Sequence, residues 1–424
     1  MDRSLPWILR LSSAAGLASI VIAHSLSAYL ADVNTHFSWL TSSQPAVLLN
    51  EAETRIASAA SPSSSSESSG AARADTADAS DANLANIRAL ASAALVLDPL
   101  SARALRILGQ ATKDPENTRR FMDAAVATSR HEGVATLWLI GFNFEQKNYA
   151  EAARLADLQL RTGTASDVIP ALSRIAETES RSEVSKLLAA KPPWRRLFFQ
   201  NMEAGISDAR TPLQLLLELK NSDAGPSSDE VELYLSLLLR NKLYDLAYYT
   251  WLMFLPEEQL SATGLLANAD FKFPLSGEAF DWALKGGEGV RIEIEPEPDN
   301  SQVSALHFAF LGGRVGEHSV SQKLTLRPGN YRMSGRQMGK VVGPRGVRWQ
   351  VSCLDNPGSP PIASGPMLTG AMKWAPFEFT FKVPTTACPA QEVRLSLDAR
   401  SPSERVVSGN IWLDDLNIQP NSAH

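Results

Sequence analysis

The sequence predicts a multidomain α + β protein with an apolar N-terminal segment, a helical middle part and a C-terminal antiparallel β-sandwich. Three observations support this fold class. A stretch near the N-terminus lacks charged residues, apolar residues recur every three or four positions from 83 to 262, and the pattern changes to alternation from about 263 onward. A length of 424 residues agrees with two or three domains.

Residues 11–31 predict a membrane-spanning helix. They contain no Asp, Glu, Lys or Arg, and about 20 such residues are enough to cross a bilayer. Arg3 and Arg10 precede the stretch and Asp32 follows it, which favours a cytoplasmic N-terminus. We expect residues 1–32 to be a single-pass signal anchor in a bacterial inner membrane, with the bulk of the chain periplasmic. A cleaved signal peptide and a helix of a soluble domain are the alternatives.

Residues 33–82 are expected to be a partly disordered tether. From 58 to 82 the composition is dominated by Ser, Ala and Asp, with almost no large apolar side chains. Such a segment buries too little surface to offset the entropy lost on ordering it. A short helix is expected between Val47 and Ile56.

Residues 83–262 are expected to form a helical domain. The segments 147–152 and 241–247 each place Tyr, an acidic residue and Ala after a polar turn, between two apolar helical stretches. They resemble the helical hairpins of tetratricopeptide repeats, and Asp98 with Pro99 resembles the end of a further repeat helix. The resemblance implies an α-solenoid that binds a protein partner. A generic helical bundle is the alternative.

The C-terminal part shows the alternation of strands that have one buried face. Val347, Trp349 and Val351 lie on one side of a predicted strand, while Arg348 and Gln350 lie on the other. Other strands of this part alternate in the same way, which is typical of antiparallel sheets. We therefore expect Trp349 to lie in the core of a sandwich.

The two ends of this β region carry recognisable motifs. The segment 266–271 reads LANADF, and the segment 408–418 reads SGNIWLDDLNI. These ends resemble the two edges of a galactose-binding-like jelly roll, the fold of many carbohydrate-binding modules. The resemblance covers residues 263–420 and leaves 421–424 as a tail.

The resemblance also implies a metal site where the two ends meet. In such modules, acidic residues of both ends hold a structural calcium ion, and the matching residues here are Asp270, Asp414 and Asp415. Lys272 stands where the family commonly has glutamate, which removes an oxygen ligand and adds a positive charge. We therefore expect no cofactor. A structural calcium ion is the alternative.

Modules of this type stack sugar rings on aromatic side chains and hold sugar hydroxyls with polar ones. The resemblance implies Trp282 and Trp374 as stacking residues. The polar candidates on outward strand faces are Arg336, Arg348, Gln350 and Arg394. Arginine presents planar donors to carboxylates, which favours an acidic polysaccharide as the ligand. The alternative is an ordinary solvated sheet face.

Two cysteines, Cys353 and Cys388, stand 35 positions apart in the β region. This spacing excludes a C-x-x-C redox motif, and two thiols alone do not make a zinc site. We expect one structural disulfide in an oxidising compartment. Two buried free thiols are the alternative.

Composition and motifs exclude several classes of function. A net charge of −6 without a basic stripe argues against a nucleic-acid partner. The six histidines are scattered and form no metal or catalytic motif, so we expect no enzyme. Carboxylates are present in the β region, and an enzyme with a noncanonical site is the lesser alternative.

The leading hypothesis from the sequence is a non-catalytic, membrane-anchored envelope protein. Its helical repeats would bind a protein partner and its jelly roll a carbohydrate, as in an accessory factor of bacterial polysaccharide assembly or export. The main alternative is a pure interaction scaffold of a membrane complex that binds no sugar. The domain pairing supports the first reading by analogy alone.

Overall fold

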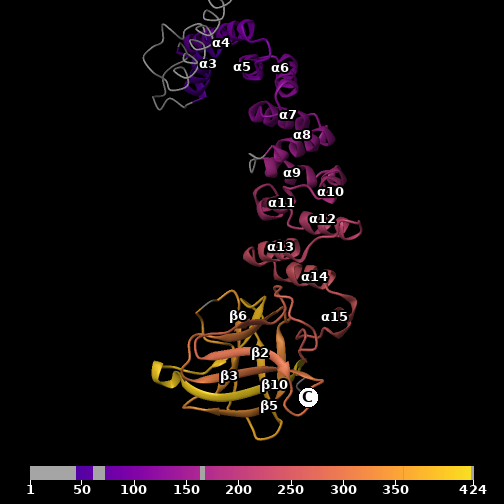
Figure 1. The fold of residues 1–424 in the computed structure, drawn as a ribbon, viewed down its shortest axis with the longest axis vertical. Coiled ribbons are helices and arrows are strands. Elements are labelled where there is room, and N and C mark those ends of the chain that lie inside the picture. The colour runs from indigo at the N-terminus through magenta and orange to yellow at the C-terminus, as the bar shows by residue number, and fades with distance from the viewer. Residues whose placement is uncertain (1–43, 61–71, 163–167, 357, 422–424) are drawn as a thin grey trace, which may run out of the picture. The chain divides into compact units, whose positions relative to one another are not determined.

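The structure is a computed structural model that describes residues 44–60, 72–162, 168–356 and 358–421 (Figure 1). The predicted combination of a helical N-terminal half and an antiparallel β-sandwich is confirmed. The chain divides into two compact units. We call them the helical unit, which ends at Thr211 and also includes Asn221–Ala224, and the sandwich unit, which holds Pro212–Lys220 and the chain from Gly225.

The boundary between the units lies before the predicted position at 262 and 263, because the last helices pack on the strands. The rings of Tyr248 and Phe280 are 5.3 Å apart, and those of Trp251 and Phe280 are 5.8 Å apart. These aromatic contacts bury apolar surface of the helices within the sandwich unit.

Within the described chain, helices α5, α6 and α13 begin at a side chain that caps them. The Asp114 carboxylate accepts a hydrogen bond from the Asn117 amide at 2.9 Å, and Ser227 forms a capping box with Glu230. The helices are α3 (Pro45–Ala60), α4 (Ala72–Leu97), α5 (Ala102–Gln110), α6 (Pro115–Thr128), α7 (Gly133–Glu145), α8 (Tyr149–Arg161), α9 (Ile169–Ala176), α10 (Arg181–Ala189), α11 (Arg195–Asn201), η2 (Met202–Ala204), α12 (Thr211–Lys220), α13 (Ser228–Arg240), α14 (Tyr244–Phe254) and α15 (Glu257–Ala262).

The strands form two five-stranded antiparallel sheets. Sheet A has the order β1-β4-β9-β6-β7 and sheet B the order β2-β3-β10-β5-β8, so the closing strand β10 is central in sheet B. The elements are β1 (Ala283–Lys285), β2 (Val290–Pro296), β3 (Ser304–Arg314), β4 (Ser319–Leu324), β5 (Gly329–Val342), β6 (Val347–Cys353), β7 (Ala363–Leu368), β8 (Ala375–Val383), β9 (Gln391–Leu397), η3 (Pro402–Arg405) and β10 (Val406–Pro420).

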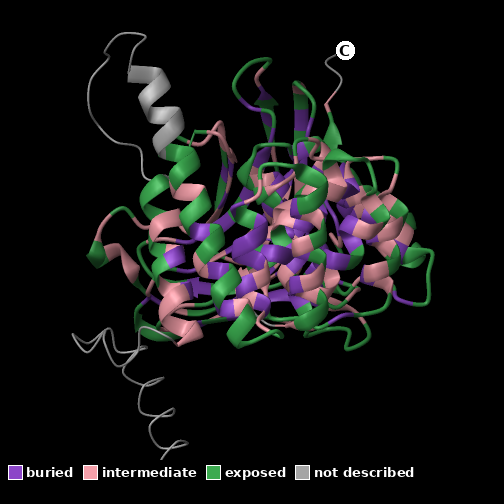
Figure 2. Cartoon of the chain, turned by 90° about the horizontal axis from the view of Figure 1, so that it is seen from above, coloured by how far each residue is buried: buried purple, intermediate pink, exposed green. Residues whose placement is uncertain are grey.

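The core of the sandwich is built by the inward side of each strand. Buried positions alternate with less buried ones along β4 and β6. Figure 2 colours the buried residues purple and the exposed ones green. Trp349 is 1% exposed, which confirms its predicted place in the core, and Phe308 and Ile411 are fully buried beside it in the same cluster. Alternation puts every second residue on the solvent side, where a ligand can reach it.

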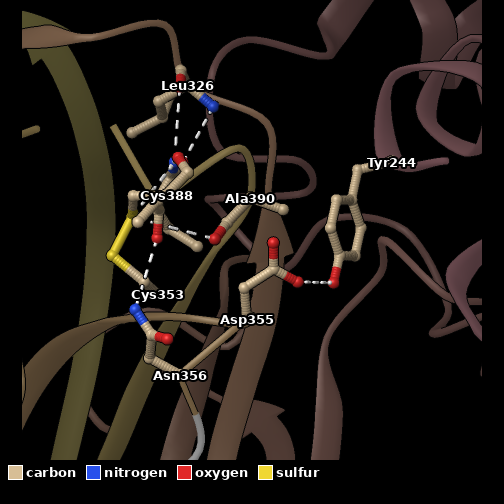
Figure 3. Close-up of a disulfide and its surroundings, with 9 residues drawn as sticks. Tyr244, Leu326, Cys353, Asp355, Asn356, Cys388 and Ala390 are labelled. Atoms are coloured by element: carbon tan, nitrogen blue, oxygen red, sulfur yellow. Dashed lines mark hydrogen bonds between the residues drawn. A yellow bond between two sulfur atoms is a disulfide. The ribbon is translucent and has the colours of Figure 1, made fainter. Parts of the chain in front are cut away.

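Cys353 and Cys388 form the predicted disulfide, with a Cα–Cα distance of 5.1 Å (Figure 3). The buried Gln391 side chain fixes the segment around Cys388. Its amide donates to the Cys388 carbonyl at 2.8 Å, and its Oε1 accepts from the Leu326 amide at 2.9 Å. The disulfide thus closes a part of the sandwich whose buried polar groups are hydrogen-bonded.

Asp355, two residues after Cys353, joins this corner to helix α14 (Figure 3). The Tyr244 hydroxyl donates to its carboxylate at 2.7 Å, and Lys242 pairs with the same oxygen at 3.3 Å. The Tyr244 bond lowers the pKa of Asp355, and burial together with that bond raises the pKa of Tyr244 to about 12. The polar turn between α13 and α14 therefore has a specific contact on the sandwich.

The two predicted helical hairpins are present, as the pairs α7–α8 and α13–α14. Lys147 and Lys242 adopt the left-handed conformation at the turns, with φ of 58° and 59°. The Asn148 amide donates to the Asn143 carbonyl at 2.8 Å, and the Leu243 amide donates to the Leu238 carbonyl at 2.9 Å. Both turns are Schellman motifs, which end a helix by satisfying its last carbonyls.

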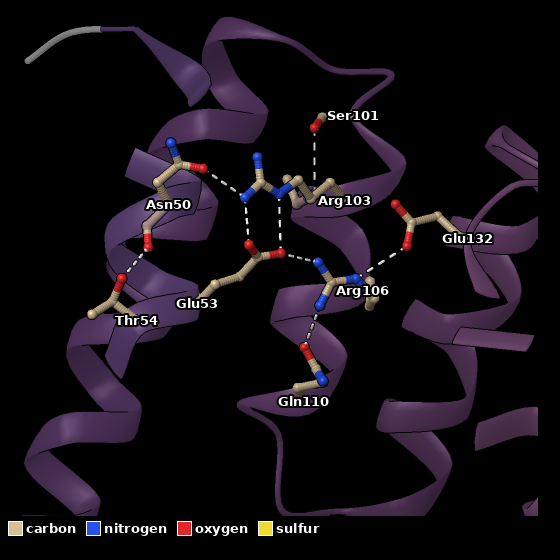
Figure 4. Close-up of polar contacts among 9 residues, drawn as sticks. Asn50, Glu53, Thr54, Ser101, Arg103, Arg106, Gln110 and Glu132 are labelled. Carbon is tan, nitrogen blue, oxygen red and sulfur yellow. Dashed lines mark hydrogen bonds and ion pairs between the residues drawn. The ribbon is translucent and has the colours of Figure 1, made fainter. Parts of the chain in front are cut away.

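The first helices of the helical unit are joined by an ionic network (Figure 4). The Glu53 carboxylate of α3 pairs with Arg103 and Arg106 of α5, and Arg106 also donates to Glu132 at 3.0 Å. Arg103 donates to the Asn50 amide oxygen at 2.7 Å. The hydrogen bond from Arg103 is the main cause that lowers the pKa of Glu53. Helix α3 is thereby part of the folded helical unit.

The predicted tether is shorter than its composition suggested. Helix α3 runs to Ala60 and α4 begins at Ala72, so residues 72–82 are helical. Alanine is a strong helix former, and extending an existing helix is far easier than starting one. The later part of α4 supplies the start, since Ile87 and Ala91 are buried in the helical unit.

In the part of the chain that the structure describes, no helix is both long and apolar enough to cross a bilayer. The predicted anchor at 1–32 lies outside the described residues.

Candidate functional site

The opening motif of the β region builds structure. The Asn268 side chain bonds both the amide and the carbonyl of Phe273, at 3.0 and 2.8 Å. The Ala269 carbonyl accepts from the Leu416 amide at 3.2 Å, so the opening and closing segments meet as the resemblance implied.

The prediction that Trp282 stacks a sugar ring is wrong. Trp282 is 1% exposed, its indole nitrogen donates to the Asn268 carbonyl at 3.0 Å, and its ring lies 5.9 Å from that of Trp349. A tryptophan next to a loop is buried here because the opening segment folds over it. Burial of a ring this large contributes to the core and leaves no face for a ligand.

The predicted polar residues do not share one face. Arg348 and Gln350 lie on β6 and Arg394 on β9, which are neighbours in sheet A. Arg336 lies on β5 in sheet B. Alternation identified all four as outward residues, but only strand pairing decides which outward residues meet. The sandwich therefore offers two separate surfaces.

On sheet A, Gln350 is directly opposite Arg394. Arg348 pairs with Asp398 at 3.1 Å, and Arg394 pairs with Glu392 at 2.7 Å. The arginines of this face thus each have an acidic neighbour on the strands or just beyond them.

On sheet B, His307 and Trp412 occupy the middle of the outer face. They are opposite one another on β3 and β10, and their rings are parallel, with centroids 3.9 Å apart. The His307 Nδ1 is 2.8 Å from a carboxylate oxygen of Glu295 on β2. Burial would raise the pKa of Glu295, but its bond and charge interaction with His307 outweigh it and lower the pKa. Trp412 remains half-buried and reachable from solvent.

Arg336 is the centre of a cluster beside this pair. One guanidinium nitrogen lies 2.5 Å from Glu297 and 2.7 Å from Asp414, and another lies 2.6 Å from Asp415. The guanidinium lies over the Trp374 ring, 4.2 Å from its centroid. A planar cation on an aromatic face is an attractive arrangement, and four neighbours fix the arginine in place. Trp374 thus lies beside Arg336, and its role as a stacking residue for a sugar stays a prediction.

The two inner carboxyl groups of the cluster are almost completely covered. The side chains of Glu297 and Asp414 are 4% and 1% exposed. Burial raises the pKa of Glu297 to about 7, and its hydrogen bond with Asp414 adds to the rise, while the charge of Arg336 opposes it. One positive charge therefore serves two buried carboxyl groups, and Glu297 takes up a proton more readily than a free glutamate does.

Glu297→Gln is expected to flatten the pH dependence of stability between about pH 4.5 and 7. Wild-type Glu297 binds a proton on folding in this interval, because its pKa rises from 4.5 to about 7. The folded state then holds more protons, so the free energy of unfolding falls as the pH rises, by up to about 1.4 kcal/mol per pH unit. Denaturant titrations across this range measure the slope. Glu293→Gln changes an exposed residue of β2 and is the control. If the free energy of unfolding depends on pH equally in wild type and Glu297→Gln, the raised pKa of Glu297 is contradicted.

The implied calcium ligands do not form a metal cluster. Asp270 is exposed and its carboxylate accepts from the Lys272 amide at 3.4 Å, while Asp414 and Asp415 pair with Arg336. No group of three His, Cys, Asp or Glu side chains in the described ranges is arranged to hold a metal ion. The Arg336 guanidinium takes up the negative charge that Asp414 and Asp415 would otherwise offer to a cation.

Three residues of this surface were not identified from the sequence: His307, Trp412 and Glu297. Trp412 had a usable signal, because it alternates with the apolar Ile411 and Leu413 and so had to point outward. The sequence held no such signal for His307 or Glu297, because their partners Trp412 and Arg336 lie on other strands that are distant in the sequence.

No family model and no curated protein matches the chain. Among solved structures, it is similar over its C-terminal β region to a CBM4 structure, with 15% identity, a TM-score of 0.29, and 37% of this chain and 99% of that chain covered. TmCBM61 in complex with β-1,4-galactotriose is 20% identical, with a TM-score of 0.26, and the match covers 38% of this chain and 99% of that chain. A family 16 carbohydrate-binding module is 16% identical, with a TM-score of 0.27, and the match covers 37% of this chain and 99% of that chain. The C-terminal part of this chain is similar to these carbohydrate-binding modules.

Proposed function

We propose that this chain is a non-catalytic carbohydrate-binding protein of the bacterial envelope and that the outer face of sheet B is its sugar site. The cluster of Arg336, Trp374, Glu297 and Asp414 is the observation that supports this proposal. A solvated sheet face gains little from burying two carboxyl groups under one arginine, since the desolvation cost is high. A buried group with a strongly shifted pKa is a candidate for a functional site.

The chemistry of the face suits a sugar. Trp412 and Trp374 are half-buried and offer apolar ring surface and edges to the carbon atoms of a pyranose. The Arg336 side chain is 27% exposed and held in place by its neighbours, so a sugar hydroxyl group would meet a donor that needs no reordering.

The remaining parts of the proposal concern the compartment and the partner. The disulfide supports an oxidising compartment, which agrees with an anchor at residues 11–31 and a periplasmic location. Exposed apolar side chains on α7, Val134 at 48% and Leu137 at 40%, support a protein partner for the helical repeats. We place the protein among accessory factors of polysaccharide assembly or export.

Trp412→Ala is expected to weaken glycan binding by about tenfold, because a well-placed aromatic contact contributes about 1 kcal/mol or more. Full-length protein is tested by affinity electrophoresis and calorimetry on neutral and acidic polysaccharides. Trp138→Ala, which removes a half-buried tryptophan from α7 in the helical unit, is the matched control and should bind normally.

Two outcomes would contradict the sugar site. One is the absence of retention on every polysaccharide; the other is unchanged binding by a folded Trp412→Ala variant. If the first occurs while the protein co-purifies with a membrane complex, the chain is an interaction scaffold instead.

A further inference from the structure

The sandwich carries a hollow of about 240 Å³ on sheet A, away from the Trp412 face on sheet B. Its lining comes from β1, β4 and β9, from the connection between β3 and β4, and from the segment that follows β9 up to the end of η3. The lining residues are Lys285, Gly316, Glu317, His318, Ser319, Arg394, Ser396, Leu397, Ala399 and Arg405. We call it the basic hollow, because three of its side chains carry a full positive charge.

Strand pairing explains the arrangement of the lining. Lys285 on β1 is opposite Ser319 on β4, and Arg394 on β9 is opposite Ser321 on the same strand. The side chains of Lys285 and Arg394 thus stand in adjacent outward rows, with serine hydroxyls between them. Arg405, at the end of η3, completes the hollow from the side.

His318 forms a rigid and uncharged part of the wall. Its Nδ1 is 2.9 Å from the Gly316 carbonyl, and its Nε2 accepts from the Leu397 amide at 3.3 Å, which requires the neutral imidazole. Burial and the nearby charge of Arg405 lower the pKa of His318. The positive charge of the hollow therefore comes from lysine and arginine, which stay charged at neutral pH.

A second hollow of about 260 Å³ adjoins the first. The two share Ala399 and Arg405, and the second is also lined by Arg314, Arg400, Ser401 and Pro402. Two anionic groups bound side by side would both contact Arg405. Two adjoining hollows that share Arg405 suit a chain of charged units better than a single small ion.

The acidic residues nearby leave much of this charge uncompensated. Glu317 is exposed in the lining, Glu392 pairs with Arg394 at 2.7 Å, and Glu404 pairs with Arg345 at 2.8 Å. Among the described residues, the side chains of Lys285, Arg314 and Arg405 form no ion pair. Such a concentration of positive charge on a chain of net charge −6 attracts anions.

We propose that the basic hollow binds the carboxylate-bearing sugars of an acidic polysaccharide, and so provides a second subsite besides the Trp412 face. Arginine donates to a carboxylate in a bidentate manner, and the serine hydroxyls of Ser319 and Ser396 suit the ring hydroxyls. A volume of about 240 Å³ is below the roughly 300–1,000 Å³ of sites for drug-sized ligands and suits one sugar unit. The proposal relies on the proposed function for the nature of the carrier, a glycan.

The test compares full-length wild-type protein with a Lys285→Gln, Arg405→Gln variant by calorimetry. The probes are a linear oligouronate and its carboxyl-reduced, neutral counterpart of the same length. We expect the wild type to bind the oligouronate at least about tenfold more tightly, and the double variant to lose this preference. The control variant Lys382→Gln, Arg327→Gln removes the same amount of positive charge elsewhere on the sandwich. It should keep the preference for the oligouronate.

The outcomes separate this inference from the sugar site itself. Equal affinity of the wild type for the two probes, or an unchanged preference in the Lys285→Gln, Arg405→Gln variant, would overturn the basic hollow even if Trp412→Ala weakens both probes. Binding of inorganic phosphate at the hollow without binding of the oligouronate would also overturn it, because the ligand would then be a free anion.

Discussion

Arg336→Ala is expected to lower the free energy of unfolding by about 3–5 kcal/mol near pH 8 and by clearly less near pH 5. The arginine is the positive partner of Glu297 and Asp414, whose side chains are 4% and 1% exposed. Without it, two buried carboxylates must either stay charged without a partner or take up protons. Proton uptake is easier at low pH, and Glu297 already has a raised pKa of about 7.

Denaturant unfolding at the two pH values measures this effect. Arg332→Ala is the matched control, since Arg332 is on the same strand but its pair with Glu378, at 3.6 Å, is exposed. That change should cost no more than about 1 kcal/mol. The triple variant Arg336→Met, Glu297→Gln, Asp414→Asn should recover much of the loss, because it leaves no buried charge. A cost for Arg336→Ala that is small or independent of pH would mean that the cluster is not buried in solution.

Replacing both cysteines by serine is expected to destabilise the sandwich unit by about 4 kcal/mol. The disulfide closes a loop of 35 residues, and the loss of chain entropy in the unfolded state scales with the logarithm of that length. Thermal and denaturant unfolding of wild type and of the Cys353→Ser, Cys388→Ser variant measure the difference. A reductant should destabilise the wild type to the same extent and leave the variant unchanged. Equal stability of the oxidised wild type and the variant would contradict this.

The disulfide should also be coupled to the contact of Asp355 with Tyr244. Asp355 follows Cys353 by two residues, and its carboxylate accepts the Tyr244 hydroxyl at 2.7 Å. A looser segment holds this hydrogen bond less well, so Tyr244→Phe should cost less in the serine variant than in the wild type. A double-mutant cycle measures this coupling, which is zero if the two features are independent.

The local sequence pattern was enough to predict the burial of Trp349 but not that of Trp282. Trp349 stands within a regular strand between Val347 and Val351, so the period of two assigns it to the core, where it lies. Trp282 follows an irregular segment without a period, and its burial depends on the opening turn around Asn268 folding over it. A ring next to a loop is therefore not reliably a surface ring.

The arginines illustrate the same limit for the candidate sites. Alternation placed Arg336 and Arg348 on outward faces, but strand order in the sandwich does not follow the order in the sequence. Pairing of β5 with β10 brings Arg336 to Asp414, 78 residues away. A left-handed Asp415, at φ of 50°, then shifts the register between Asp414 and Asn417. Such a bulge redirects side chains in a way that the period of two does not contain.

The sequence by itself predicted a helical part followed by a β part, the two hairpin turns and the outward orientation of the polar strand residues, and it favoured a disulfide over two free thiols. Only the tertiary structure decided that Arg336 neutralises two buried carboxyl groups, that Trp412 and His307 share its face, and that Lys285, Arg394 and Arg405 surround a hollow on the other sheet. The physical reason is the range of the interactions. Periodicity and turn chemistry act between neighbours in the chain, whereas charge clusters and ring contacts depend on pairing between strands that are far apart in sequence.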